Sequence, residues 1–357
     1  MTAAPVYFYL PCLESQFLRL PRRLQEYSNW QKTETELSPF TGRYHWVLQT
    51  YLHLLDAGAN VDLVRELPAA GIVISHVECL DYGQRPSPHM MLVSLLVDKD
   101  VPLPHASLHV THNPAQRLPL MLRRHYIPPW PQIGLIPRSP TRGARFEIVA
   151  FVGYPENLHP DLATEKFTQG LADLGLRLVI PAPADWHDFS EIDVVLAVRN
   201  FGCVELHLNK PALKLYNAWL AHVPAVLGFE SAYRREGKPG SDYLEATNSY
   251  EVLRVLRRLI DEPGLRDSIV AAGVERMKTR SESHLRVLWK ELLNDHLTPL
   301  YARWTHQTFF RIAFRIAGAV RERLLWRKPA WFKESSSTLD CLEQVQADKA
   351  IFMKDRS

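Results

Sequence analysis

Cysteine is scarce in this chain of 357 residues, and long apolar runs are missing. The four cysteines, Cys12, Cys79, Cys203 and Cys341, form no C-x-x-C pair, which argues against a disulfide scaffold and a zinc ribbon. Scattered cysteines are typical of a reducing compartment, so we expect a cytoplasmic protein. Because no apolar run reaches about 18 residues, we expect no transmembrane span. The apolar run Val6–Leu10 is too short for a signal peptide and indicates a first strand.

Glycine and charge are moderate, at 16 residues and 23% of the chain, whereas 46% of the residues are apolar. This composition excludes a fibrous protein and a mainly disordered one. At about 150 residues per domain, the length predicts about two domains. The net charge of +3 indicates no particular partner by itself, so its distribution along the chain matters more.

Proline marks the expected boundary between two domains. Nine of the 26 prolines lie between Pro102 and Pro140, and each proline fixes φ and lacks an N–H group. Such a segment favours a stiff, extended linker. The expected division is an N-terminal Rossmann-like domain at 1–127, a linker at 128–145, a C-terminal Rossmann-like domain at 146–295, a basic, aromatic-rich helical segment at 296–333 and a tail at 334–357.

Apolar patterns predict alternating strands and helices on both sides of that linker. The expected strands are 6–10, 71–75, 92–97 and 108–110 in the first domain and 146–152, 176–180, 193–198 and 224–227 in the second. The expected helices are 44–57, 161–174, 211–222 and 249–261, the last capped by Asn248 with Glu251. This alternation predicts an α/β protein with two Rossmann-like domains facing each other across a cleft, followed by a C-terminal helical segment.

The most informative segment is NKPALKLYNAWLAHVPAVLGFESAY, residues 209–233. Lys210 and Lys214 open an expected helix that leads into a short strand, and Glu230-Ser231 begins the next helix. Ligands of parallel sheets bind at the carboxyl ends of strands and beside helix N-termini, where paired ammonium groups can hold a diphosphate. The alternative is a solvated helix face, on which lysines four residues apart are common.

These residues resemble the donor-site stretch of GT-B glycosyltransferases, which has the pattern (K)P-x-x-K-x-x-E-x-x-A-x-G-x-P. The family's Lys matches Lys214 and its Pro matches Pro224, whereas its ribose-binding Glu is Asn217 and its Gly is His222. The stretch is also similar to bacterial, chiefly cyanobacterial, glycosyltransferases. The resemblance implies a GT-B fold and transfer of a sugar from a nucleotide-diphosphate sugar, the donor substrate, to a hydroxyl group of a sugar, lipid or natural product.

The resemblance also implies site roles for neighbouring residues. Asn217 would hold the ribose, while Glu230 and Ser231 would contact the sugar or the phosphates. An amide can bond to a hydroxyl pair, although it lacks the family's charge. Glu230 could instead complement the dipole of the helix that follows it.

Two more candidates follow expected strands of the second domain. Arg199 ends the strand DVVLAV and suits bidentate contact with phosphate, or it forms a surface pair with Glu205 or Asp193. Gly153 follows the first strand and lets the backbone approach a ligand closely, or it belongs to a plain turn.

The first domain is expected to hold the acceptor and any catalytic base. A group that deprotonates the attacking hydroxyl is best supplied by His, Asp or Glu. We assign this role to His76 and Glu78, after the strand GIVIS, ahead of Asp98, His109 and His112. A satisfied structural histidine is the alternative for each, since the chain has 15 histidines.

Asp98 and Asp100 form a D-x-D pair, which is the metal signature of the other common glycosyltransferase fold. Such carboxylates could hold Mn²⁺ or Mg²⁺ on a diphosphate. Pro102 and Pro104 follow at once and favour a surface turn. We therefore expect an enzyme of hexosyltransferase type that needs neither a metal nor a bound cofactor.

The segment 296–333 carries a net charge of +7, which leaves −4 for the remaining chain. Its basic residues are Arg303, Arg311, Arg315, Arg321, Arg323, Arg327, Lys328 and Lys333, against Glu322 alone. A helical wheel places Phe310, Ala313, Phe314, Ile316, Ala317, Val320 and Leu324 on one apolar arc, which Arg321 interrupts. An interfacial helix on the anionic inner face of a membrane and a helix packed on the first domain both fit. We expect no nucleic-acid partner, because no binding motif accompanies the basic residues.

Two other functions stay open at the level of sequence. One is a sugar-nucleotide epimerase on the same fold. The other is a non-catalytic, membrane-associated binding protein that kept the fold, which the change to Asn217 makes credible.

Overall fold

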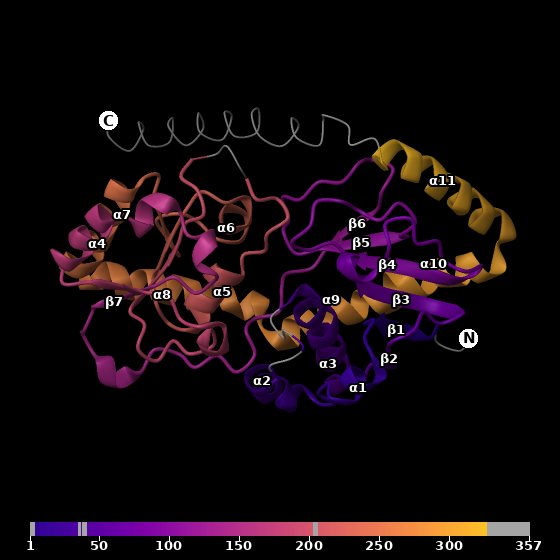
Figure 1. Ribbon diagram of the computed structural model, residues 1–357, viewed down its shortest axis with the longest axis horizontal. Coiled ribbons are helices and arrows are strands. Elements are labelled where there is room, and N and C mark those ends of the chain that lie inside the picture. The colour runs from indigo at the N-terminus through magenta and orange to yellow at the C-terminus, as the bar shows by residue number, and fades with distance from the viewer. Residues whose placement is uncertain (1–3, 35–36, 38–40, 203–205, 327–357) are drawn as a thin grey trace.

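Two parallel β-sheets organise the chain, as the computed structural model shows for residues 4–34, 37, 41–202 and 206–326 (Figure 1). The first sheet has the order β2-β1-β3-β4-β5-β6, and the second has the order β11-β10-β9-β7-β8. The strands of the first sheet are β1 (Val6–Tyr9), β2 (Val61–Val64), β3 (Ala70–His76), β4 (His89–Leu95), β5 (Leu108–Thr111) and β6 (Arg124–Tyr126). Those of the second are β7 (Ile148–Ala150), β8 (Arg177–Val179), β9 (Val194–Ala197), β10 (Ala225–Leu227) and β11 (Leu244–Glu245). The predicted α/β class with two parallel sheets is confirmed.

Helices cover both sheets, and their sequence signals explain most of their ends. They are α1 (Glu14–Leu18), α2 (Leu24–Thr33), α3 (Gln49–Asp56), α4 (Glu165–Ala172), α5 (Leu213–Leu220), α6 (Ser231–Glu236), α7 (Ser249–Asp261), α8 (Pro263–Met277), α9 (Glu282–Glu291), α10 (Thr298–His306) and α11 (Thr308–Trp326). The predicted helix at 249–261 is confirmed as α7. Asn248 Oδ1 accepts a hydrogen bond from the backbone N–H of Glu251 at 2.8 Å, which is the expected cap.

Three expected helices differ from those observed. The helix expected at 44–57 starts with a π-helical turn, Arg43–Leu48, before α3. The one expected at 161–174 is a 3-10 turn, Pro160–Ala163, followed by α4, because Thr164 caps α4 through its hydroxyl. The one expected at 211–222 is only α5, so Lys210 lies before the helix and not on its first turn.

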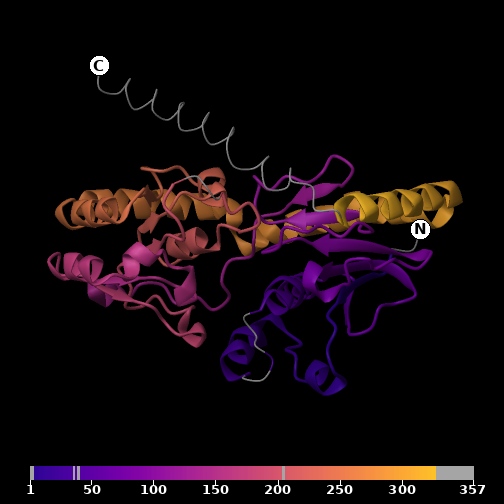
Figure 2. The same cartoon turned by 45° about the horizontal axis from the view of Figure 1, so that its top comes forward.

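The C-terminal helices return to the first sheet. Helices α9 and α10 pack against it, and the orange-to-yellow run of α8 to α11 crosses the length of the molecule (Figures 1 and 2). Tyr301 donates to the carbonyl of His89 at 2.9 Å, and Trp304 Nε1 donates to that of Pro88 at 3.0 Å. Leu285, Trp289 and Leu292 are fully buried in the core of the first sheet. One chain segment therefore belongs to the core of both halves.

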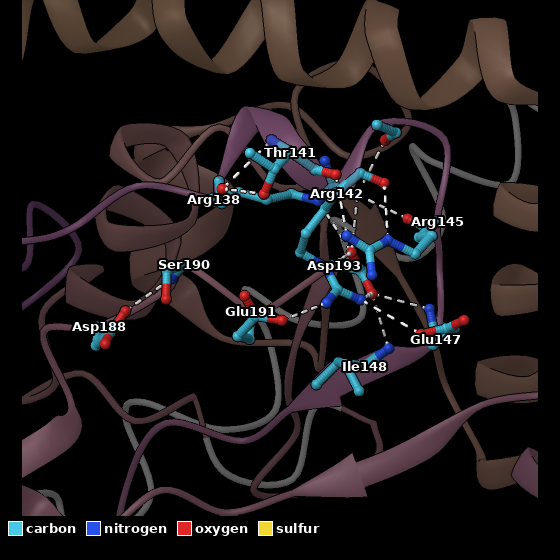
Figure 3. A network of polar contacts seen from close by, with 12 residues as sticks. Arg138, Thr141, Arg142, Arg145, Glu147, Ile148, Asp188, Ser190, Glu191 and Asp193 are labelled. Atoms are coloured by element: carbon cyan, nitrogen blue, oxygen red, sulfur yellow. Dashed lines mark hydrogen bonds and ion pairs between the residues drawn. The ribbon is translucent and has the colours of Figure 1, made fainter.

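The proline-rich connector is fixed at both ends. Trp130 stacks on His53 at 3.9 Å between ring centroids, and its Nε1 donates to Thr50 Oγ1 at 2.9 Å. At the other end, Arg138 and Arg142 converge on Asp193, as Figure 3 shows.

Asp193 is fully buried, and five N–H groups donate to its carboxylate. Arg138 Nε and Arg142 Nε lie at 2.9 Å, Arg142 Nη2 at 2.7 Å, and the backbone N–H groups of Glu147 and Ile148 at 2.9 Å. The pKa of Asp193 is lowered, since these bonds outweigh the effect of burial, which raises it. The later part of the connector is therefore bound to the second sheet.

Candidate functional site

The carboxyl ends of the two sheets face each other. Asp98, after β4, accepts a hydrogen bond from Lys210 at 3.1 Å, and Asn113, after β5, donates to Ser231, after β10, at 2.9 Å. Tyr126, the last residue of β6, donates to Glu236 in α6. Ligands of parallel α/β folds bind at this edge, so the structure places the predicted donor residues at a suitable position.

Lys214 lies at this edge, and among the described residues no carboxylate contacts its ammonium group. Its Nζ donates to the carbonyl of Val152, just after β7, at 2.7 Å and lies 5.2 Å from the ring centroid of Phe151. The pKa of Lys214 is lowered to about 7, because desolvation and, to a smaller extent, the nearby charge of Arg199 outweigh the opposing effects of Glu230 and Asp98. An ammonium group that no carboxylate contacts within the described ranges favours an anionic ligand.

Gly153 lies directly beside Lys214. A Cβ at Gly153 would come within 2.7 Å of Lys214 Nζ, so a side chain here would displace the ammonium group. The missing side chain at Gly153 therefore leaves room for the Lys214 ammonium group, which a plain turn would not require.

Arg199, after β9, pairs with Glu230, after β10. Arg199 Nη1 lies 2.6 and 2.5 Å from the two carboxylate oxygens, and both side chains are largely buried. Burial acts to lower the pKa of Arg199, but the Glu230 carboxylate raises it overall. Arg199 Nε is buried and has no hydrogen-bond partner among the described residues. The arginine therefore keeps an unused donor although its charge is compensated.

Glu230 caps α6 by position but makes no side-chain cap bond. Its carboxylate therefore serves Arg199 and not the helix N-terminus. Of the two surface pairs considered for Arg199, the one with Asp193 is not formed, because Asp193 binds Arg138 and Arg142. Glu205 lies outside the described residues, so the pair with it stays a prediction.

Lys210 connects the two halves. Its Nζ lies 3.1 Å from Asp98 Oδ1, while Asp98 Oδ2 accepts from Trp46 Nε1 at 3.1 Å. Asp98 has a φ of +59°, a conformation that is uncommon outside glycine, and its N–H donates to the carbonyl of Asn209 at 2.9 Å. Lys210 and Lys214 thus point to different partners and do not form the paired cradle expected from their spacing.

Ser231 and Asn113 form a second connection. Asn113 Nδ2 lies 2.9 Å from Ser231 Oγ, 3.1 Å from the carbonyl of Lys210 and 3.3 Å from that of His207. Ser231 Oγ in turn donates to the carbonyl of Leu206 at 2.7 Å. Sequence reasoning missed Asn113, although it lies three residues after the end of the expected strand 108–110. Its position after a strand was the available signal.

Asn217 is buried on α5, one turn after Lys214. Its Oδ1 has no hydrogen-bond partner among the described residues. A buried carbonyl oxygen without a donor is costly, and a hydroxyl group of a ligand would satisfy it.

His76 and Glu78 lie at the carboxyl end of β3. His76 is fully buried, and its Nε2 lies 2.9 Å from the carbonyl of Val97. Burial lowers the pKa of His76, although the Val97 carbonyl and Glu78 oppose this effect. Glu78 is partly exposed and pairs with Lys99 at 2.6 Å. The catalytic assignment of both residues stays a prediction.

Two other candidates for a base, His109 and His112, are as deeply buried as His76. Desolvation lowers the pKa of each to about 4. His112 Nδ1 contacts the carbonyl of Ile127 at 2.6 Å. Neutral, buried histidines of this kind pack as structural residues.

Asp98 and Asp100 do not converge with other ligands. Within the described ranges, no three His, Cys, Asp or Glu side chains cluster in a way that could hold a metal ion. Asp98 is engaged by Trp46 and Lys210. Burial raises the pKa of Asp100, against the effect of Lys210.

A buried network around Glu236 was not anticipated. Glu236 accepts from Tyr126 of the first sheet and from Tyr216 at 2.6 Å, and Arg280 pairs with it at 2.8 Å. It therefore joins β6, α5, α6 and the start of the returning helices. Its residues are far apart in sequence, so no local pattern could reveal it.

Solved structures of other proteins resemble this chain in fold. No protein-family model and no curated protein sequence matches the chain. Among solved structures, Anabaena HepE in complex with UDP and glucose superposes with a TM-score of 0.52 and 14% identity, covering 82% of this chain and 100% of HepE. Sucrose-phosphate synthase from Thermosynechococcus elongatus superposes with a TM-score of 0.53 and 11% identity, covering 83% of this chain and 100% of that protein. The chain therefore has the GT-B glycosyltransferase fold that the sequence resemblance implied.

Membrane contact is one of the two expectations for the C-terminal segment 296–333. Among the described residues, no helix is both long enough and apolar enough to cross a bilayer. Arg327, Lys328, Lys333 and the expected tail at 334–357 lie outside the described residues.

Proposed function

We propose that this protein is a glycosyltransferase that moves a sugar from a nucleotide-diphosphate sugar to a hydroxyl acceptor. The observation that carries the proposal is Lys214 at the carboxyl end of the second sheet, whose desolvated ammonium group contacts no carboxylate of the described residues. The fold is shared with HepE, whose structures contain UDP and glucose or UDP-glucose. UDP is therefore the first nucleotide to test.

The residues of the site have complementary tasks in this proposal. Lys214 and Arg199 stabilise the diphosphate as it leaves with increasing negative charge, and Arg199 Nε offers an unused donor. Asn217 Oδ1 accepts from a ribose hydroxyl. Glu230 holds Arg199 in place, and Ser231 approaches the sugar or the phosphates.

The acceptor side belongs to the first sheet. We retain His76 and Glu78 as the proposed base, and Glu78 is the more accessible of the two. A sugar, lipid or natural-product hydroxyl remains the proposed acceptor class. Hexosyl transfer without a metal follows if Lys214 and Arg199 supply the countercharge, and a cytoplasmic location agrees with the scattered cysteines.

A thermal-shift comparison of UDP, UDP-glucose and uridine tests the proposal. A ligand at 100 times its Kd adds about 2.7 kcal/mol to the free energy of unfolding. We expect both diphosphates to raise the melting temperature at concentrations where uridine does not, with and without EDTA. If no nucleoside diphosphate in a panel of all common bases stabilises the protein, the donor site is absent. In that case a non-catalytic binding protein that kept the fold is the better proposal.

The reaction products distinguish an epimerase from a transferase. An epimerase interconverts the donor sugar without releasing UDP, whereas a transferase releases UDP when an acceptor is present. NMR of UDP-glucose incubated with the protein alone therefore distinguishes the two.

A further inference from the structure

Helix α11 packs on the first sheet through one of its faces. Phe314 meets Trp304 edge to face, with 5.1 Å between ring centroids. Gly318 lies so close to His105 that a Cβ would come within 2.4 Å of its Nδ1. Arg321 is buried, with its guanidinium 4.6 Å from the Phe314 ring centroid. The arginine that interrupts the apolar arc expected from sequence thus belongs to the packed face.

The opposite face of α11 is an exposed apolar stripe. Its five members are Phe309 (89% exposed), Ile312 (49%), Ile316 (61%), Val320 (51%) and Leu324 (49%). They recur at spacings of three and four residues and therefore form one continuous row along the helix. Soluble monomers rarely expose long apolar rows, which usually mark an interaction surface. We call these five residues the outer stripe of α11.

Cationic side chains border the outer stripe without neighbouring carboxylates. Arg315 and Arg323 are exposed, and no ion pair is found for either among the described residues. The single carboxylate of α11, Glu322, faces the protein, where it lies 3.1 Å from Arg85 and 3.0 Å from His105. The stripe therefore combines apolar side chains with uncompensated positive charge.

A loop of the first sheet adds to this combination. Leu120 is fully exposed, Met121 is about half exposed, and Arg123 is exposed in the segment before β6. Burial lowers the pKa of Arg321 in α11, and the nearby charge of Arg123 lowers it as well. Apolar side chains and a cation thus recur next to the helix.

We propose that the outer stripe of α11 docks on an anionic lipid surface, with Arg315 and Arg323 at the phosphate level and the apolar side chains among the acyl chains. We favour lipid over a protein partner because an anionic membrane offers an apolar layer with fixed anions beside it. These two features match the apolar side chains of the outer stripe and the exposed arginines next to them. The proposal goes beyond the sugar-transfer function and does not depend on it.

Vesicle co-sedimentation of the full chain tests this docking. We expect binding to vesicles of phosphatidylglycerol and phosphatidylcholine but not of phosphatidylcholine alone. Binding should weaken steeply between 0.1 M and 1 M salt, as the Debye length falls from about 10 Å to about 3 Å. Arg315→Gln combined with Arg323→Gln should weaken partitioning about thirtyfold, which corresponds to about 1 kcal/mol for each arginine.

Matched variants make the result decisive. Arg177→Gln with Arg257→Gln removes two exposed arginines from the second half of the molecule and should change partitioning less than twofold. Ile316→Ser with Val320→Ser should abolish binding while leaving the melting temperature unchanged, because both side chains are exposed.

Several results would overturn the proposal. The first is wild-type protein that stays in the supernatant with anionic vesicles, and the second is binding that the Ile316 and Val320 variant retains. A lower melting temperature of that variant would show that the chain itself covers the stripe. A dimer that the same variant dissociates, measured by light scattering, would assign the stripe to a second copy.

Discussion

Lys214 is the residue on which the proposed site depends most. Burial and the charge of Arg199 lower its pKa to about 7, against the opposing effects of Glu230 and Asp98, and no carboxylate of the described residues contacts its ammonium group. In the ligand-free protein, the charged form therefore predominates below about pH 7 and is lost as the pH rises above that value. A bound diphosphate favours the charged form and raises the pKa of Lys214.

This difference predicts the pH dependence of nucleotide binding. Between pH 7 and pH 9, UDP affinity should fall by up to about tenfold per pH unit, and binding at pH 8 should take up about one proton. Isothermal titration calorimetry in two buffers with different ionisation enthalpies measures this uptake. Lys214→Ala should take up none. Equal affinity across this range without proton uptake would remove Lys214 from the phosphate contact.

The residue scale also shows the limit of spacing arguments. Lys210 and Lys214 are four residues apart, yet Lys210 contacts Asp98 of the first sheet and Lys214 contacts Val152 of the second. The helix begins only at Leu213, so Lys210 lies before it and the two lysines share no helix face. A pairing across the two sheets cannot be predicted from local sequence, because it depends on how the sheets meet.

At the scale of elements, the later part of the connector is held by one buried carboxylate. Asp193 binds Arg138 and Arg142 and also two backbone N–H groups at the start of the second sheet. The proline content predicted a stiff linker at 128–145, because each proline restricts the backbone at its own position. The anchoring residue lies about 50 positions further along the chain, so the sequence offered no local signal for it.

Asp193→Asn should therefore destabilise the protein strongly. The substitution keeps the shape but leaves the buried Arg142 without its main counter-charge, a loss that costs about 3–5 kcal/mol when a buried pair is broken. Urea unfolding at neutral pH measures the change. Glu191→Gln is the matched control, because its exposed carboxylate binds the same arginine and should contribute less than about 1 kcal/mol. Similar losses for both variants would contradict this account.

Elements with strong apolar runs were predictable, including the edge strand β8, whereas three other short edge strands were not. The strands GIVIS and DVVLAV correspond to β3 and β9, because buried parallel strands read as continuous apolar runs. Strands β2, β6 and β11 lie at sheet edges and carry mixed residues such as Asp62, Arg124 and Glu245. Their pairing is determined by neighbouring strands and not by their own pattern.

At the scale of the whole molecule, the two sheets are joined through polar contacts at their carboxyl ends. Asp98 with Lys210, Asn113 with Ser231, and Glu236 with Tyr126 each connect one half to the other. The returning helices make a second connection, because α9 and α10 pack in the core of the first sheet. A donor bound beside Lys214 would thus lie next to residues of both halves, as transfer to an acceptor requires.

The central claim is that Lys214 binds the diphosphate of a nucleotide donor, and calorimetric titration of UDP and uridine tests it most directly. The titrations use wild-type protein, Lys214→Ala and, as a control, Lys166→Ala, which removes an exposed lysine from α4. We predict that Lys214→Ala weakens UDP binding by about 1.5–3 kcal/mol, the contribution of a hydrogen bond to a charged group. Uridine binding and the Lys166→Ala variant should be unaffected. Equal weakening of UDP and uridine by Lys214→Ala, or UDP binding that survives it unchanged, would contradict the account.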